Sequence, residues 1–236
     1  MLSSDRSPPA LLGTIGVVCL ALVIGCLTWL VFTRDDVEMV SVEPFTPAPE
    51  TPLKQPVAVF LGDSYTQPGI WPGVVAEARG WKMVNLASGG TGYVARSTGK
   101  TAQQGCGRSE CRNFVEMADA AIKREPDVVV VAGGRNDHGR SIDKAAHELF
   151  HTLRDRLPNA RIIAVQPMWD ASAYPDFLAR YAKVIKKEVE AVDGEYVEIG
   201  NPLAKQPELM QPDGVHPTWE GQVILGRAVN KALGQT

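Results

Sequence analysis

A serine that follows a short apolar run is the first residue of this sequence with the setting of a nucleophile. Residues 57–61 are apolar and rich in valine, and Gly62, Asp63 and Ser64 follow directly. Such a run is typical of a strand buried on both faces, as in a parallel sheet covered by helices. Ligands of open α/β sheets bind at the carboxyl ends of the strands, so Ser64 has a position suited to chemistry. The same residue types are also common in ordinary turns.

A carboxylate and an imidazole three residues apart supply a possible base. Asp213 and His216 precede Pro217, which disfavours helical backbone at His216 and places the pair in a loop. The spacing lets the carboxylate meet one imidazole nitrogen and leave the other free, which is the arrangement that a serine nucleophile requires. Taken alone, the pair would be more typical of a surface turn or a metal site.

Polar, glycine-rich turns follow two further apolar runs. Ser88, Gly89 and Gly90 come after residues 82–86, and the segment 134–137 (Gly-Arg-Asn-Asp) comes after residues 127–132. In a parallel sheet these turns emerge at the same edge as Ser64. Together they would offer a hydroxyl, a backbone N–H and a side-chain amide at one rim.

Strand patterns and helix patterns alternate along the chain from residue 57 onward. This alternation indicates right-handed crossovers and a mainly parallel sheet of five strands, covered on both sides in a three-layer α/β/α sandwich. We expect one domain over residues 57–236 and find no internal repeat. The expected strands are 57–61, 82–86, 127–132, 161–165 and 195–199, and the expected helices lie near 71–79, 114–122, 142–157, 177–189 and 218–233.

As a set, the polar residues resemble those of the SGNH hydrolases, the GDSL-type lipases and esterases. The four letters of that name are matched in order by Ser64, Gly90, Asn136 and His216. Residues 62–64 (Gly-Asp-Ser), 85–91, 134–137 and 213–216 (Asp-x-x-His) are similar to the blocks of this family. The resemblance covers residues 57 to about 233. The sequence has no Gly-x-Ser-x-Gly elbow of the other large class of α/β hydrolases.

The resemblance implies a flavodoxin-like SGNH hydrolase fold and a defined set of roles. Ser64 would attack an ester carbonyl, His216 would take its proton, and Asp213 would hold and stabilise the imidazolium. The backbone N–H groups of Ser64 and Gly90 and the amide of Asn136 would form the oxyanion hole. An acyl-enzyme would then be resolved by water, with no metal and no cofactor.

The predicted function is a serine esterase that cleaves acyl or acetyl esters of lipids or cell-envelope carbohydrates. No large apolar insertion suggests a lipase lid, so we expect short acyl chains. Two alternatives remain open: an acyltransferase to a sugar hydroxyl, and a non-catalytic envelope-binding domain. The net charge of −3 gives no reason to expect a nucleic-acid partner, and we expect a monomer.

The N-terminal part predicts a membrane location. Residues 11–32 contain no charge and as a helix would span about 33 Å, close to the hydrocarbon thickness of a bilayer. We expect an uncleaved signal anchor, with residues 1–10 in the cytoplasm and a Pro-rich linker, 33–56, outside. A cleaved signal peptide, which would make the protein secreted, should have a shorter apolar region. Residues 23–26 loosely resemble a lipobox, but the apolar run continues past Cys26.

Four cysteines are present, and two lie in the predicted domain. Cys106 and Cys111 are five residues apart, and we expect them to form a disulfide in an oxidising compartment, worth about 2 kcal/mol. Two free thiols are the alternative. Cys19 and Cys26 lie within the apolar segment and are interpreted as packing residues.

Other polar residues have less specific interpretations. His147 and His151 are one turn apart on a predicted helix and could form a metal pair, but no third ligand is evident, so we interpret them as surface residues. Asp63 should shape its turn, and Asp137 should hydrogen-bond its loop. Arg135 and Arg140 could meet an anionic substrate, although solvated loop charges are commoner, and His138 could line the pocket.

Overall fold

Five parallel strands form the central sheet of the computed structural model, which describes residues 54–234. The spatial order is β2-β1-β5-β6-β7, and each neighbouring pair is parallel. This is the order of flavodoxin-like sheets and confirms the expected α/β fold with a mainly parallel five-stranded sheet. The strands are β1 (Val57–Gly62), β2 (Lys82–Asn85), β5 (Val128–Ala132), β6 (Arg161–Val165) and β7 (Glu195–Val197).

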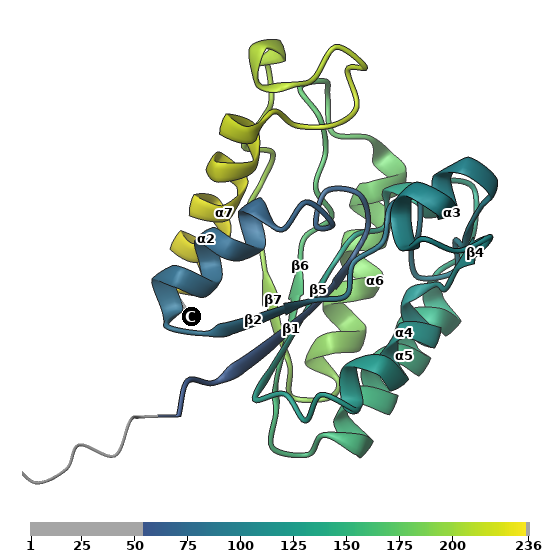
Figure 1. The fold of residues 1–236 in the computed structure, drawn as a ribbon, viewed down its shortest axis with the longest axis vertical. Helices are drawn as coiled ribbons and strands as arrows, with labels where there is room; N and C mark the ends of the chain where they lie inside the picture. The colour runs from purple at the N-terminus through teal and green to yellow at the C-terminus, as the bar shows by residue number, and fades with distance from the viewer. Residues whose placement is uncertain (1–53, 235–236) are drawn as a thin grey trace, which may run out of the picture. The chain divides into compact units, whose positions relative to one another are not determined.

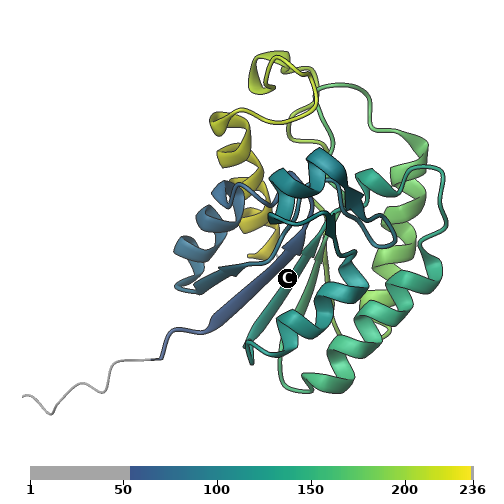
Figure 2. The same cartoon turned by 45° about the vertical axis from the view of Figure 1, so that its right-hand side comes forward.

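Helices cover both faces of the sheet (Figures 1 and 2). Helices α2 and α7 lie on one face, and α4, α5 and α6 lie on the other. Alternate residues of β1 pack on opposite faces of the sheet. Val59 and Leu61 belong to one core cluster, and Ala58 and Phe60 belong to the other. The helices are α2 (Ile70–Arg79), α4 (Phe114–Ile122), α5 (Asp143–Arg156), α6 (Asp176–Glu190) and α7 (Trp219–Leu233).

The helices begin and end at residues that satisfy their free backbone groups. Helix α4 starts with a capping box, in which Asn113 and Glu116 exchange side-chain and backbone hydrogen bonds. Helix α7 starts at Thr218, whose hydroxyl accepts from the N–H of Gly221 at 3.2 Å. The second cap fixes the point at which the His216 loop becomes helix.

The register of the sheet brings the polar turns to one edge. Gly62 at the end of β1 pairs with Ala132 at the end of β5, so the turns that follow these two strands begin at the same edge of the sheet. The N–H of Ser88 donates to the carbonyl of Gly62, which draws the loop after β2 to the same edge.

Residues 97–111 form a small strand–helix–strand unit that was not predicted from the sequence. Strands β3 (Ser97–Thr98) and β4 (Glu110–Cys111) form an antiparallel pair around the short helix α3 (Gly99–Cys106). Helix α3 buries only Ala102, so it has no apolar periodicity that would predict a helix. The expected disulfide between Cys106 and Cys111 is present and links the end of α3 to β4.

The last strand is shorter than expected. Residues 198 and 199 leave the sheet, and the N–H of Ile199 donates to Gln166 Oε1 at 3.0 Å instead of to a neighbouring strand. The expected anchor at 11–32, the expected cytoplasmic segment 1–10 and most of the expected linker 33–56 lie outside the described residues. None of the helices between residues 54 and 234 has the length and apolarity needed to cross a membrane.

Candidate active site

Ser64 stands on a tight turn at the end of β1. The N–H of Tyr65 donates to Asp63 Oδ1 at 3.0 Å, and the carbonyl of Asp63 accepts from the N–H groups of Thr66 and Gln67. A Cβ on Gly62 would lie 2.3 Å from Thr66 Oγ1, so this close turn requires glycine. The expected role of Asp63 in shaping the turn is confirmed. Asp63 is only 4% exposed, and this burial raises its pKa to about 6.

Asp213 orients His216, as their spacing predicted. His216 Nδ1 lies 2.7 Å from Asp213 Oδ2, and Asp213 Oδ1 accepts from the N–H groups of His216 at 2.9 Å and Val215 at 2.8 Å. The hydrogen bonds from His216 and Val215 hold the pKa of the Asp213 carboxyl well below its usual value, although the side chain is 47% exposed. Within the described residues, Nε2 of His216 forms no hydrogen bond, so this nitrogen can serve as a base.

Tyr65 links the serine turn to the histidine loop, a role that sequence reasoning missed. Its hydroxyl donates to the carbonyl of Val215 at 2.7 Å, and Gln222 Nε2 on α7 donates to the carbonyl of Tyr65 at 3.0 Å. The partners are 150 and 157 residues away from Tyr65 in the chain. No local pattern signals these contacts; the only sequence signal is the place of Tyr65 directly after Ser64.

The other predicted donors lie where two neighbouring loops meet. Gly90 has φ of +75°, and a Cβ there would lie 2.7 Å from Thr101 Cγ2 and 2.9 Å from Ser97 Cβ, so both its conformation and its surroundings require glycine. Asn136 Nδ2 donates to the carbonyl of Thr91 at 2.9 Å. Since an amide nitrogen carries two hydrogens, the second remains available for a ligand.

Asp137 fixes the loop that follows Gly90. It is completely buried, and its carboxylate accepts from the backbone N–H groups of Tyr93, Val94 and Ala95 at 2.8, 3.0 and 2.8 Å. Burial raises the pKa of Asp137 against the opposing effect of these hydrogen bonds. A Cβ on Gly92 would lie 2.3 Å from the carboxylate. The expectation that Asp137 hydrogen-bonds its loop is confirmed.

The predicted residues meet at one cavity of about 300 Å³. Ser64 and His216 both line it. Asp213 is hydrogen-bonded to His216 but is not among the lining residues. Within the described part of the chain, no hydrogen bond joins the side chains of Ser64 and His216, and such contacts often tighten only when substrate binds. The lining residues are Ser64, Gln67, Gly89, Gly90, Thr101, Gln104, Gly105, Arg135, Asn136, Val215 and His216.

Arg135 is held at the cavity wall by specific partners. Its guanidinium lies 3.0 Å from Asp170 Oδ2 and 3.9 Å from the centre of the Trp169 ring. Its charge is therefore paired, and it is neither a solvated loop charge nor a free anion receptor. His138 packs on Phe177 at 4.4 Å between ring centres and does not line the cavity.

The comparisons with known proteins agree with this architecture. Residues 60–224 match the model of the GDSL-like Lipase/Acylhydrolase family. The GDSL lipase Rv0518 of Mycobacterium tuberculosis is 29% identical over 185 residues, which cover 72% of this chain and 78% of the relative.

Two solved structures illustrate the similarity of the fold. A protein of Parabacteroides merdae described as a GDSL-like lipase has a TM-score of 0.59 and 18% identity, with 78% of this chain and 97% of the other covered. The carbohydrate acetylesterase Est24 of Sinorhizobium meliloti has a TM-score of 0.57 and 14% identity, with 77% and 99% covered. The chain therefore belongs to the GDSL-like lipase/acylhydrolase family and is an ester-hydrolysing enzyme.

Proposed function

We propose that this enzyme is a serine esterase that cleaves acyl or acetyl esters of lipids or cell-envelope carbohydrates, with Ser64, His216 and Asp213 as its triad. The observation that carries the proposal is the 2.7 Å contact of Asp213 with His216 beside a cavity that Ser64 also lines. A base oriented by a carboxylate is what a serine hydroxyl needs in order to act as a nucleophile.

The reaction proceeds in two halves. In the first, His216 Nε2 takes the proton of Ser64 as Oγ attacks the ester carbonyl, and then returns it to the leaving alcohol as the acyl–oxygen bond breaks. In the second, His216 takes a proton from water as the water oxygen attacks the acyl-serine, and returns that proton to Ser64 Oγ as the acyl–Oγ bond breaks and the carboxylic acid leaves. Asp213 stays ionised throughout and stabilises the imidazolium.

Three donors stabilise the negative charge that develops on the carbonyl oxygen. They are the backbone N–H groups of Ser64 and Gly90 and the second amide hydrogen of Asn136. Loss of one such donor typically raises the barrier by about 3 kcal/mol. The contact of Asn136 with Thr91 supports this role, because it fixes the amide without using both of its hydrogens.

The cavity lining favours a small or polar acyl group. Most of its side chains are polar or are those of glycines, and Val215 is the one branched aliphatic residue among them. A long acyl chain is stabilised on binding only where an extended apolar surface removes it from water. The carbohydrate acetylesterase with the same fold acts on a substrate of the class that we propose.

The test is hydrolysis of p-nitrophenyl acetate and butyrate by the full-length protein in detergent. We expect Ser64→Ala and His216→Ala each to lower kcat by at least about 10³-fold. Ser141→Ala is the matched control, because Ser141 is exposed and bonds only its neighbour Asp143. Full activity of Ser64→Ala would refute the serine mechanism.

The same experiment separates the two alternative functions. If folded protein released acid only slowly but passed the acyl group to an added sugar, the enzyme would be a transferase and not an esterase. No reaction of either kind would favour a binding domain.

We also propose that the catalytic domain faces outward from a membrane anchor at residues 11–32. The Cys106–Cys111 disulfide supports this, because such bonds persist in oxidising compartments. Protease added to intact cells should remove the domain, as detected by an antibody to its C-terminal part. Protection of the domain until the cells are lysed would overturn the proposed orientation.

A further inference from the structure

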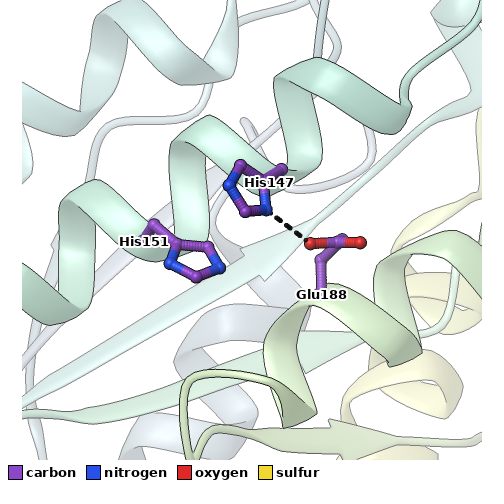
Figure 3. Close-up of side chains that lie close together, drawn as sticks. All are labelled: His147, His151 and Glu188. Atoms are coloured by element: carbon purple, nitrogen blue, oxygen red, sulfur yellow. Dashed lines mark hydrogen bonds and ion pairs between the residues drawn. The ribbon is translucent and has the colours of Figure 1, made fainter.

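Two histidines and a glutamate from neighbouring helices converge outside the esterase cavity (Figure 3). His147 and His151 lie one turn apart on α5, and Glu188 comes from α6. One ring nitrogen of each histidine and one carboxylate oxygen of Glu188 lie within 4.8 Å of one another. None of the three lines the cavity that contains Ser64, so the esterase reaction leaves this cluster unexplained.

Glu188 is held in place before any ligand arrives. Its side chain is 9% exposed, and its two oxygens have different partners. Oε1 accepts from Lys187 Nζ at 2.9 Å, and Oε2 lies 2.9 Å from His147 Nδ1. The carboxylate is therefore fixed with Oε2 turned toward the histidines.

With the two imidazoles, the cluster offers two nitrogen ligands and one oxygen ligand, a set that suits a transition metal ion. Their ring centres are 4.0 Å apart, and the side chain of His147 is 60% exposed. Zn²⁺ binds imidazole nitrogen and carboxylate oxygen at about 2.0–2.2 Å, whereas Ca²⁺ and Mg²⁺ prefer oxygen ligands. Tetrahedral geometry with such bonds separates ligand atoms by about 3.4 Å, so closure requires side-chain shifts of about 1 Å from the present spacing.

We propose that His147, His151 and Glu188 form a binding site for a first-row transition metal ion such as Zn²⁺. The ion takes one nitrogen from each histidine and Oε2 of Glu188, and water fills the remaining coordination position on the exposed side. Lys187 remains bonded to Oε1 and orients the carboxylate from outside the ligand set. The site ties α5 to α6 in place of the present His147–Glu188 contact.

The first test measures zinc binding to full-length protein in detergent, purified without a polyhistidine tag and stripped of metal with a chelator. Competition with a chromophoric chelator should show one Zn²⁺ per chain. His151→Ala and Glu188→Gln should each weaken the affinity by more than about 100-fold, since even partners of metal ligands are worth 10–100-fold. His138→Ala and His216→Ala are matched controls that remove a histidine elsewhere and should leave the affinity unchanged.

A second readout keeps the proposal separate from folding and from catalysis. At a Zn²⁺ concentration of 100 times Kd, Tm of the wild type should rise by about 5–10 °C, while Tm of His151→Ala should not respond and Mg²⁺ should have no effect. His151→Ala should retain esterase activity, and His216→Ala should lose activity but still bind zinc. Equal zinc affinity in the wild type, His151→Ala and Glu188→Gln, or no binding by the wild type, would overturn the proposal.

Discussion

A single carboxylate organises the histidine loop at the residue scale. Asp213 Oδ1 accepts from two backbone N–H groups of the turn, while Oδ2 meets the ring of His216. The same side chain therefore sets both the backbone of the loop and the ring that it presents. Because a carboxylate only accepts, its contact favours the tautomer with the proton on Nδ1 and the lone pair on Nε2.

Replacement of Asp213 by asparagine separates these two effects. Asp213→Asn retains an oxygen for the backbone N–H groups but loses the charge that, in the proposed mechanism, stabilises the imidazolium of His216. We expect kcat on p-nitrophenyl acetate to fall by about 10³–10⁴-fold, with Tm changed by only a few degrees because the side chain is half-exposed. Steady-state kinetics and thermal unfolding followed by circular dichroism check this. Activity within tenfold of wild type would show that Asp213 has no part in catalysis.

The buried carboxyl of Asp63, beside the proposed nucleophile, makes stability depend on pH. The pKa of Asp63 is about 6 in the folded state and 3.8 in its ordinary state, so the folded state binds the proton more tightly. The contribution of this group to the free energy of unfolding is fully present below pH 4. It falls by about 3 kcal/mol as the pH rises through 6. Asp63→Asn cannot ionise, so its free energy of unfolding relative to wild type should increase by about that amount from pH 4 to pH 7. Urea unfolding at several pH values measures this difference, and a constant difference would refute the prediction.

At the scale of elements, the positions of the proposed oxyanion donors depend on hydrogen bonds between two loops. Asp137, on the turn after β5, accepts three backbone N–H groups from the loop after β2. In addition, the hydroxyl of Tyr181 on α6 donates to the carbonyl of Asp137 at 2.7 Å. Two strand-end loops and one helix are thus joined at a single residue, next to Asn136.

Asp137→Asn should weaken this junction. Asparagine retains one acceptor oxygen, but its NH₂ group would face a backbone N–H donor. We expect a loss of about 2–4 kcal/mol in the free energy of unfolding, together with lower kcat, because the loop that carries Gly90 is no longer held. Asp119→Asn on the exposed face of α4 is the matched control and should change stability by less than about 0.5 kcal/mol. Equal urea midpoints for the two variants would contradict this role of Asp137.

At the scale of the whole described domain, substrate range follows from how the cavity is assembled. Loops from the ends of β1, β2 and β5, helix α3 and the segment before α7 all contribute lining residues. Most of these lining residues are polar or are glycines, and Val215 is the one aliphatic residue among them.

A series of p-nitrophenyl esters tests this consequence. We expect kcat/KM to be highest for acetate or butyrate and to fall by at least about tenfold for chains of eight carbons or more, since Val215 is the one aliphatic side chain in the lining. Ser64→Ala provides the background rate for each ester. A maximum at long chains would contradict the prediction and would indicate an apolar surface outside this cavity.

Local patterns were enough to predict much of this protein. The apolar run before Ser64 and the valine run of β5 predicted buried strands, and the amphipathic stripe of α5 predicted a helix. The contact of Asp213 with His216 was predictable because both residues lie in one short turn. The disulfide between Cys106 and Cys111 was predictable because the two cysteines are close in sequence.

Tertiary structure alone decided the contacts between distant residues. Tyr65 meets Val215 across 150 positions, and Arg135 meets Asp170 across 35, because the fold brings separate loops to one sheet edge. Likewise, His147 and His151 form a helical pair that the sequence displays, whereas Glu188 joins them only because α5 and α6 pack side by side. Periodicity reports which face of an element is buried, but the partners of that face are set by the packing of the whole chain.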